Sequence, residues 1–191
     1  MSNTKTPTKN QLTLKNVRLS FPELFNAKSV NGGKLRYTAN FLIRKDDAAQ
    51  IKAIKGIIDS ITAEEFDGKK LTPDRLPFSD GDDKEYDGYA GHYAISAAKP
   101  AASGRPTVVD KDKTPLTAED GRPYAGCYVN AVVRFYAING KSDTKSDKSY
   151  GKRICASLEV VQFWKDGEPF GAGKVDLDAL PDAEDDDVDG L

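Results

Sequence analysis

The chain of 191 residues is 38% hydrophobic and 30% charged, which suits one globular domain with polar appendages. It has no run of 18 apolar residues and starts with a polar segment, so we expect neither a membrane span nor a secretory signal, and a cytoplasmic protein. In that compartment we expect Cys127 and Cys155 to be buried small hydrophobic residues rather than a disulfide.

The net charge of −2 conceals an uneven distribution along the chain. Residues 175–191 contain eight acidic side chains and no basic one. Without these eight, 28 basic residues face 22 acidic ones, so the rest of the chain carries a net charge of +6. A basic body with an acidic tail favours a nucleic-acid partner, and the alternative is a tail that only aids solubility.

The first predicted element is a strand at residues 12–21, whose alternation shifts phase between Leu14 and Val17 and so predicts a bulge. A turn signal at 31–33 precedes a second strand at 34–44. One face of this second strand is apolar: Leu35, Tyr37, Ala39, Phe41 and Ile43. The other face is mostly polar: Arg36, Thr38, Asn40, Leu42 and Arg44.

Residues 46–66 have the spacing of an amphipathic helix. The apolar stripe is formed by isoleucines: Ile51, Ile54, Ile58 and Ile61. Asp46 or Asp47 is expected to cap the start of the helix. Such a helix either crosses over between strands or plugs one end of a barrel.

The remaining elements are extended segments joined by long loops. We expect a loop at 67–90, strands at 91–100, 124–138 and 152–164, a short extended piece at 107–109, a polar basic connection at 139–151, and a turn at 165–168. About five strands and one helix, without a βαβ rhythm, predict a mainly β fold, an OB-fold-like antiparallel five-stranded barrel. A sandwich or another small barrel is the alternative. The expected domain is 12–174, between a flexible arm at 1–11 and a disordered acidic tail at 175–191.

Motifs for catalysis or metal binding are incomplete. The "GKS" at 140–142 lacks the earlier glycine of a phosphate-binding loop, because that position is Phe135. The acidic segment at 80–88 has Lys84 where a calcium loop needs an oxygen ligand, and a single histidine, His92, leaves zinc without paired ligands. We therefore expect no enzymatic activity, no metal and no cofactor, with a carboxylate-dependent nuclease as a remaining alternative.

The strand at 124–138 separates two kinds of chemistry. Its apolar face should be core: Cys127, Val129, Ala131, Val133, Phe135 and Ala137. Its other face consists of Tyr128, Asn130, Val132, Arg134 and Tyr136. Tyrosines beside an arginine suit single-stranded nucleic acid, because bases stack on the rings and arginine pairs with phosphate. The alternative is that both tyrosines are half-buried under a loop or helix.

Basic and aromatic residues recur around the other strands, which favours a basic groove. The helix at 46–66 is not basic, which argues against reading of duplex DNA. The candidate DNA-binding residues are Arg36, Arg44, Tyr93, Lys99, Arg105, Arg122, Tyr124, Tyr128, Arg134, Tyr136, Lys152 and Arg153.

Residues 12–173 resemble a family of single-stranded DNA-binding proteins of tailed bacteriophages, long catalogued as a family of unknown function. The resemblance depends on "RPTVVD", "YAGCYVNA" and "VVQFWKDGE", and "LTLKNVRLSFPELF" fits it as well. It implies an OB-fold, single-stranded DNA binding in phage replication or recombination, and an acidic C-terminal tail. It supplies no residue-level map of the DNA site.

We therefore predict a non-enzymatic protein that binds single-stranded DNA without regard to sequence, in the host cytoplasm if a phage encodes it. The tail is expected to compete for the groove and to recruit replication or recombination proteins through Asp182, Glu184, Asp185, Asp186, Asp187, Asp189 and Leu191. Homodimerisation is left open. The alternatives are an adaptor acting through its tail and a metal-dependent nuclease.

Overall fold

The computed structural model describes residues 9–29, 31–139 and 151–171. Within these residues, seven strands form one sheet in the order β3-β4-β2-β1-β6-β7-β5. The strands are β1 Gln11–Lys28, β2 Arg36–Arg44, β3 Phe78–Asp80, β4 His92–Pro100, β5 Thr107–Val109, β6 Tyr128–Asn139 and β7 Lys152–Lys165. The helix α1 spans Ala48–Glu65, and short 3₁₀ turns include η1 (Pro73–Arg75) and η2 (Gly81–Asp83).

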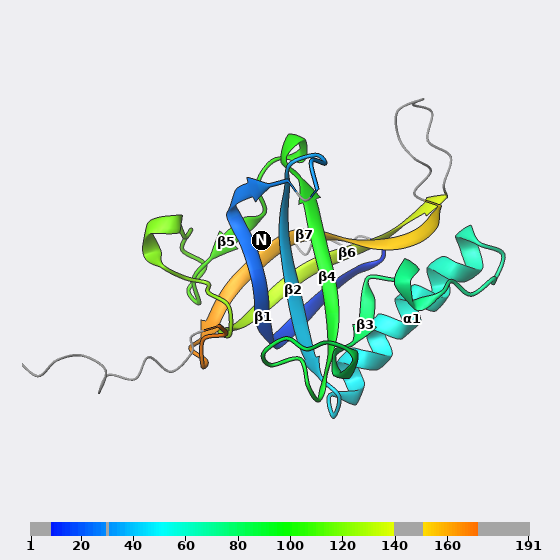
Figure 1. The fold of residues 1–191 in the computed structure, drawn as a ribbon, viewed down its shortest axis with the longest axis horizontal. Coiled ribbons are helices and arrows are strands. Elements are labelled where there is room, and N and C mark those ends of the chain that lie inside the picture. Colours follow the sequence, from blue (N-terminus) through cyan, green and yellow to red (C-terminus); the bar gives the residue numbers. More distant parts are fainter. Residues whose placement is uncertain (1–8, 30, 140–150, 172–191) are drawn as a thin grey trace, which may run out of the picture.

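Five of the strands close into a barrel (Figure 1). β1 pairs antiparallel with β2 and β6, β2 with β4, and β6 with β7. A short parallel pairing of β4 with β7, at Ala97↔Ala156 and Ala98↔Ser157, completes the ring. This arrangement confirms the predicted mainly β fold with a five-stranded OB-type barrel and one helix. β3 and β5 extend the sheet beside β4 and β7.

The barrel interior is filled by every second residue of its strands, as the pleat of a sheet requires. On β6, Val129, Ala131, Val133 and Phe135 are buried, and they lie in one core cluster with residues of β1, β2, β4 and β7. The predicted apolar face of this strand is therefore confirmed. Tyr136, on the opposite face, is 40% exposed.

The helix covers part of the core beside one end of the barrel (Figure 1). The side chain of Asp47 accepts a hydrogen bond from the backbone of Gln50 and caps the first turn, as predicted. Ile54, Ile58 and Ile61 are buried in the barrel core. Because β2 and β4 are antiparallel neighbours, α1 is not a crossover between parallel strands. In the part of the chain that the structure describes, no helix is long and apolar enough to cross a membrane.

The first strand differs in length from its prediction. β1 continues to Lys28, past Phe21 and Pro22, with register shifts against β2 between Ser20 and Glu23 and again before Lys28. The predicted bulge between Leu14 and Val17 is confirmed by a shift in the β1–β6 register. The sequence prediction ended the strand early because a shifted register breaks the alternation that identifies a strand.

Three side chains lie on a different face or at a different depth from those predicted. Leu35 precedes β2 rather than lining its apolar face, and it is 55% exposed. Leu42 was assigned to the polar outer face of β2, yet it is buried because Tyr89 and Phe170 pack over it. Both cysteines are free thiols, but only Cys127 is fully buried, whereas Cys155 is half-buried on the outside of β7.

Candidate nucleic-acid interface

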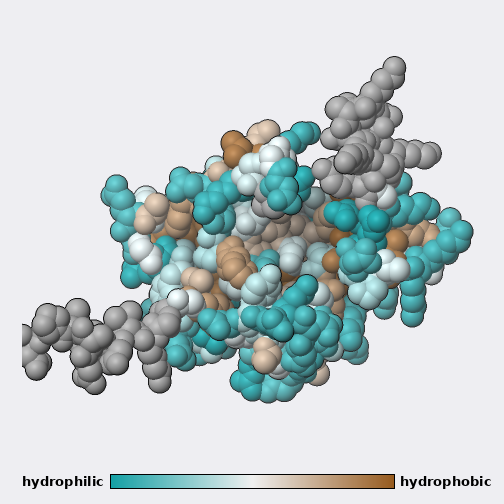
Figure 2. Space-filling model, in the orientation of Figure 1, coloured by the Kyte–Doolittle hydropathy of each residue, from teal (hydrophilic) through white to brown (hydrophobic). Residues whose placement is uncertain are grey.

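A groove crosses the outer face of β2, β4 and the beginning of β7. It encloses a cavity of about 240 Å³. The small and polar side chains of its floor are Thr38, Asn40, Ser96, Ala98 and Cys155, and apolar residues, among them Leu76, Pro77 and Ile154, complete the lining. Its rim contains three arginines and an aromatic ring: Arg36, Arg75, Arg153 and Tyr136. Figure 2 shows the face of the molecule on which β2 and β4 lie, with hydrophobic side chains near its centre and hydrophilic ones around them. We call this groove the arginine groove.

Strand register brings the floor residues together. Thr38 of β2 pairs with Ala98 of β4, and Ala98 pairs in turn with Ser157 of β7. Residues that pair across a sheet point to the same face, so the outward positions of the three strands form one surface. Tyr136 of β6 pairs with Cys155 of β7 and stands at the far side of this surface.

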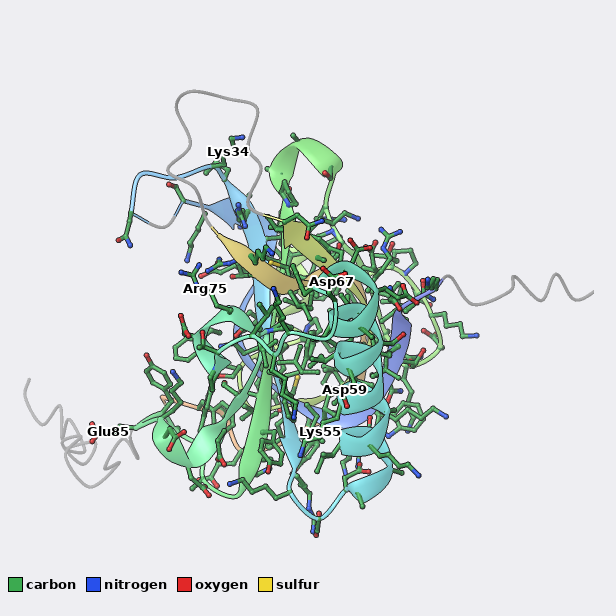
Figure 3. All side chains as sticks on the ribbon, turned by 90° about the vertical axis from the view of Figure 1, so that its right-hand side faces the viewer. Lys34, Lys55, Asp59, Asp67, Arg75 and Glu85 are labelled. Carbon is green, nitrogen blue, oxygen red and sulfur yellow. The ribbon has the colours of Figure 1, made fainter. Side chains whose placement is uncertain are left out.

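The rim of the groove is mainly cationic. Arg36 begins β2, and Arg75 ends η1 close to the start of β7 (Figure 3). Among the described residues, one carboxylate lines the cavity, that of Asp74, whose oxygen lies 3.4 Å from Nε of Arg75. A hydrogen bond with Thr72 and the nearby arginines lower the pKa of Asp74, so it stays ionised and offsets one of the cations. Among the described residues that line the cavity, arginines outnumber carboxylates, which suits a polyanion.

Tyr136 presents a neutral aromatic ring to the groove. Partial burial raises the pKa of its phenol above the usual value, and the neighbouring Cys155 thiol raises it further. Burial also raises the pKa of the Cys155 thiol. Neither group is charged near neutral pH, so this wall of the groove does not repel phosphate and leaves a ring available for stacking.

The polar floor residues have unused hydrogen-bonding capacity. Asn40 donates from Nδ2 to the hydroxyl of Tyr89 at 2.9 Å, while the hydroxyls of Thr38 and Ser96 form no side-chain hydrogen bond among residues 9–29, 31–139 and 151–171. Elsewhere on the outer surface polar groups pair with each other, as Asn130 does with Gln162 at 3.0 Å. Hydroxyl groups can donate or accept, so this floor suits base edges of any type.

Of the predicted DNA-binding residues, the structure brings Arg36, Tyr136 and Arg153 together in the arginine groove. Lys99 and Arg134 meet instead at Glu159, with nitrogen–oxygen distances of 3.5 and 2.9 Å. Burial alone would raise the pKa of Glu159, but hydrogen bonds from Ser157 and Arg134 and both cations hold it below the usual value. These two cations are therefore already partly neutralised.

Other candidates lie away from the groove. Tyr128 is at the opposite end of β6, where the amino group of Lys165 and the guanidinium of Arg18 lie 4.6 and 5.6 Å from its ring centroid. Arg44, at the end of β2, is paired with Asp46. Tyr93 is on the inward-facing side of β4 and stacks on Phe78, with ring centroids 4.8 Å apart.

The last four candidates are dispersed over the surface. The hydroxyl of Tyr124 donates a hydrogen bond to Asp166 at 2.8 Å and accepts one from the backbone N–H of Gly167 at 3.1 Å. These two bonds hold Tyr124 against the turn after β7. Burial raises the pKa of Tyr124. Arg122 is paired with Asp110 at 2.6 Å. Arg105 lies over an aromatic ring, 5.5 Å from the Phe25 centroid. Lys152 is exposed at the start of β7.

Arg75 and the floor residues were missed by sequence reasoning. Arg75 lies in a loop that gives no periodic signal, and its place beside β7 depends on the tertiary fold. The alternation of β2 placed Thr38 and Asn40 outward, but a small or polar outward residue is usual on a solvated strand. The acidic tail residues named above lie outside the described residues. Among residues 9–29, 31–139 and 151–171, no three His, Cys, Asp or Glu side chains form a metal-binding group.

Comparison with known proteins gives consistent matches. Residues 10–189 match a family described as "Enterobacter phage Enc34, ssDNA-binding protein". Protein p50 of Acyrthosiphon pisum secondary endosymbiont phage 1 is 43% identical over 175 residues, which cover 86% of this chain and 89% of p50.

Solved structures agree with the fold. The single-stranded DNA-binding protein from bacteriophage Enc34 superposes with a TM-score of 0.69 at 30% identity, covering 90% of this chain and 94% of that one. The same protein in complex with ssDNA also gives a TM-score of 0.69, at 30% identity over 87% of this chain and 97% of that one. Gp2.5 of bacteriophage T7 shares the fold, with a TM-score of 0.55 at 16% identity over 93% of this chain and 98% of that one.

Proposed function

Because the chain belongs to the family of the Enterobacter phage Enc34 ssDNA-binding protein, we propose that it binds single-stranded DNA in the arginine groove. The observation that carries this assignment is the convergence of three arginines and the Tyr136 ring around one cavity on the outer face of the barrel. OB-folds bind oligonucleotides on the face formed by the second and third strands of the barrel, which here are β2 and β4.

The mechanism combines charge neutralisation with contacts to unpaired bases. Arg36, Arg75 and Arg153 neutralise phosphates, and a base stacks on Tyr136. The hydroxyls of Thr38 and Ser96 accept or donate toward the base edges, so no base type is excluded. Duplex DNA hides these edges and the faces of its bases, so we expect the groove to prefer single strands.

The proposed biological role follows from this binding. A protein that covers unpaired strands protects them during phage DNA replication or recombination in the host cytoplasm, and it performs no reaction of its own. The acidic residues after 175 are proposed to recruit replication or recombination proteins that present basic pockets.

A salt titration tests the groove directly. Labelled oligo-dT is titrated with wild-type protein and with the Arg36→Ala/Arg153→Ala variant at several salt concentrations, using fluorescence anisotropy. The variant should bind more weakly and lose about 1.4 from the slope of log affinity against log salt, because each phosphate contact to a single strand contributes roughly 0.7. Arg44→Ala is the matched control, since Arg44 is on the same face of β2 but outside the groove. An unchanged slope in the double variant would exclude the groove as the binding site.

The two cysteines provide a second, independent readout. Cys155 lines the groove, whereas Cys127 is fully buried and its pKa is raised to about 11 by burial. Alkylation at mildly basic pH should label Cys155 first, and bound oligo-dT should slow that labelling. Cys127 should stay unlabelled until the protein unfolds. Equal labelling of Cys155 with and without DNA would contradict the proposed site.

A further inference from the structure

Two exposed aromatic side chains lie next to each other outside the arginine groove. Phe21 and Tyr86 are each 53% exposed. Their ring centroids are 5.0 Å apart and their planes meet at 79°, an edge-to-face pair. Phe21 comes from β1, and Tyr86 comes from the loop after η2. Most aromatic side chains in the described residues are more buried, so this pair needs an explanation.

The backbone at Phe21 is strained in a way that exposes its ring. Its φ is +45°, in the left-handed region that non-glycine residues rarely adopt. The β1–β2 register shifts between Ser20 and Glu23, so Phe21 lies at a bulge. Bulges redirect side chains, and strained backbone is concentrated at functional sites. A strained bulge that turns a phenyl ring toward solvent is costly for stability and indicates a use for the ring.

The pair is connected to the groove through Tyr89. The ring centroid of Tyr89 lies 5.2 Å from that of Tyr86 and 6.4 Å from that of Phe21. The hydroxyl of Tyr89 accepts a hydrogen bond from Asn40, a residue of the groove floor. In Figure 3, Arg75 of the groove rim and Glu85 beside Tyr86 lie on the same side of the molecule. In the sheet, Asn40 pairs with Ser20, the residue before Phe21, so the aromatic pair begins one residue beyond the position paired with the groove floor.

The charges around the pair differ from those of the groove. A cavity of about 380 Å³ beside the rings is lined by Glu85 and Asp87 as well as by Phe21, Tyr86 and Phe170. Carboxylates repel phosphates, so this region does not suit the DNA backbone. The faces of uncharged bases can still stack on the rings while the phosphates remain directed to solvent.

We propose that Phe21 and Tyr86 form a second base-stacking subsite, which holds a base of the strand where it leaves the arginine groove. This inference rests on the proposed function, because the ligand is the same single strand. The subsite contributes affinity through stacking alone, whereas the groove contributes through both stacking and charge. The two contributions therefore differ in their dependence on strand length and on salt.

The test uses the Phe21→Asn/Tyr86→Ala variant of the full chain and a length series of oligo-dT. Asparagine tolerates left-handed backbone, so the substitution removes the ring without adding strain. Some oligonucleotides in the series are just long enough for wild type to bind. The variant should bind these with the same affinity as wild type. It should bind long ones roughly tenfold or more weakly, with an unchanged salt slope. Melting temperature checks the fold.

A second variant keeps the ring and reports on stacking. Phe21→Trp adds an indole to a chain whose sequence has one tryptophan, Trp164, so Trp164 alone is the background. Long oligo-dT should quench the added fluorescence and short oligo-dT should not. Unchanged affinity of the double variant at every length, while Arg36→Ala/Arg153→Ala still binds weakly, would overturn the subsite and leave the groove. Absence of wild-type binding at any length would overturn the proposed function itself.

Discussion

Glu159 decides how much positive charge is available beside the arginine groove. Its carboxylate pairs with Lys99 and Arg134 and so offsets the charge of two cations. Glu159→Gln should therefore tighten single-strand binding and steepen the salt slope by up to about 0.7 for each additional phosphate that the freed cations neutralise. Anisotropy at several salt concentrations measures both quantities. Weaker binding would show that Glu159 positions the two cations for DNA rather than neutralising them.

The same carboxylate links stability to pH. The pKa of Glu159 is lower in the folded protein than its usual value, so its ionised form stabilises the fold at pH values above the unfolded-state pKa. This contribution disappears as the pH falls through the folded-state pKa. Glu159→Gln should melt at a lower temperature than wild type at pH 7, and the difference should shrink toward pH 3. A constant difference across this range would assign the effect to packing.

Two substitutions at Tyr136 separate the contribution of its ring to DNA binding from that of its hydroxyl. Tyr136→Ala should weaken oligo-dT binding by about 1–3 kcal/mol if a base stacks on the ring, while Tyr136→Phe should retain most of the affinity. The side chain is 40% exposed, so neither substitution should unfold the protein. Isothermal titration and thermal melting measure the two effects. Normal binding by Tyr136→Ala with a much lower melting temperature would make this ring part of the packing.

At the scale of elements, the side chain of Gln50 in α1 forms hydrogen bonds with the backbone at the bulge in β1. Gln50 accepts a hydrogen bond from the backbone N–H of Lys15 at 2.7 Å and donates one to its carbonyl at 3.0 Å. These bonds satisfy the backbone groups that the bulge removes from the β1–β6 ladder. Gln50→Ala should lower the free energy of unfolding by about 1–2 kcal/mol and leave DNA affinity unchanged. Denaturant titration measures it, with exposed Lys52→Ala as the control.

Elements with a regular period were predictable from sequence. β6 and α1 alternate or repeat clearly, and their buried faces match the predicted ones. β3 was not predicted, because Phe78–Asp80 is too short to show a period and is a strand only through its pairing with β4. The extension of β1 was missed because the register shifts at Phe21 and Pro22 interrupt the alternation. These segments are strands because they pair with neighbouring strands, and the local sequence pattern does not show that pairing.

The candidate site was predictable only in part for a related reason. Alternation along β6 correctly turned Tyr128 and Tyr136 outward, but it could not show that only the end of the strand with Tyr136 lies beside the groove. It also could not show that Glu159 would lie beside Arg134. Arg75 reaches the groove because η1 packs near β7, a contact between distant parts of the chain. The sequence showed which residue types are present, whereas only the folded barrel showed which of them lie together.

At the scale of the whole molecule, the closure of the barrel and the distribution of charge both shape the arginine groove. The parallel β4–β7 pairing brings the outer faces of β2, β4 and β7 side by side, and without it Arg36 and Arg153 would not share a groove. The described strands thus carry a groove with arginines on its rim. The net charge of the chain is nevertheless −2, because eight acidic residues follow position 175.

Removal of residues 175–191 should reveal how far these acids oppose the groove. The deletion changes the net charge from −2 to +6. If the acids compete with DNA for the arginine groove, the shortened protein should bind oligo-dT more tightly. The gain should be largest at low salt, because ions screen the competition. Anisotropy at low and high salt measures this gain, and an unchanged melting temperature serves as the control for folding. Equal affinity at low salt would exclude competition. A pull-down with replication proteins tests recruitment separately, since retained association of the shortened chain would assign their binding to the barrel.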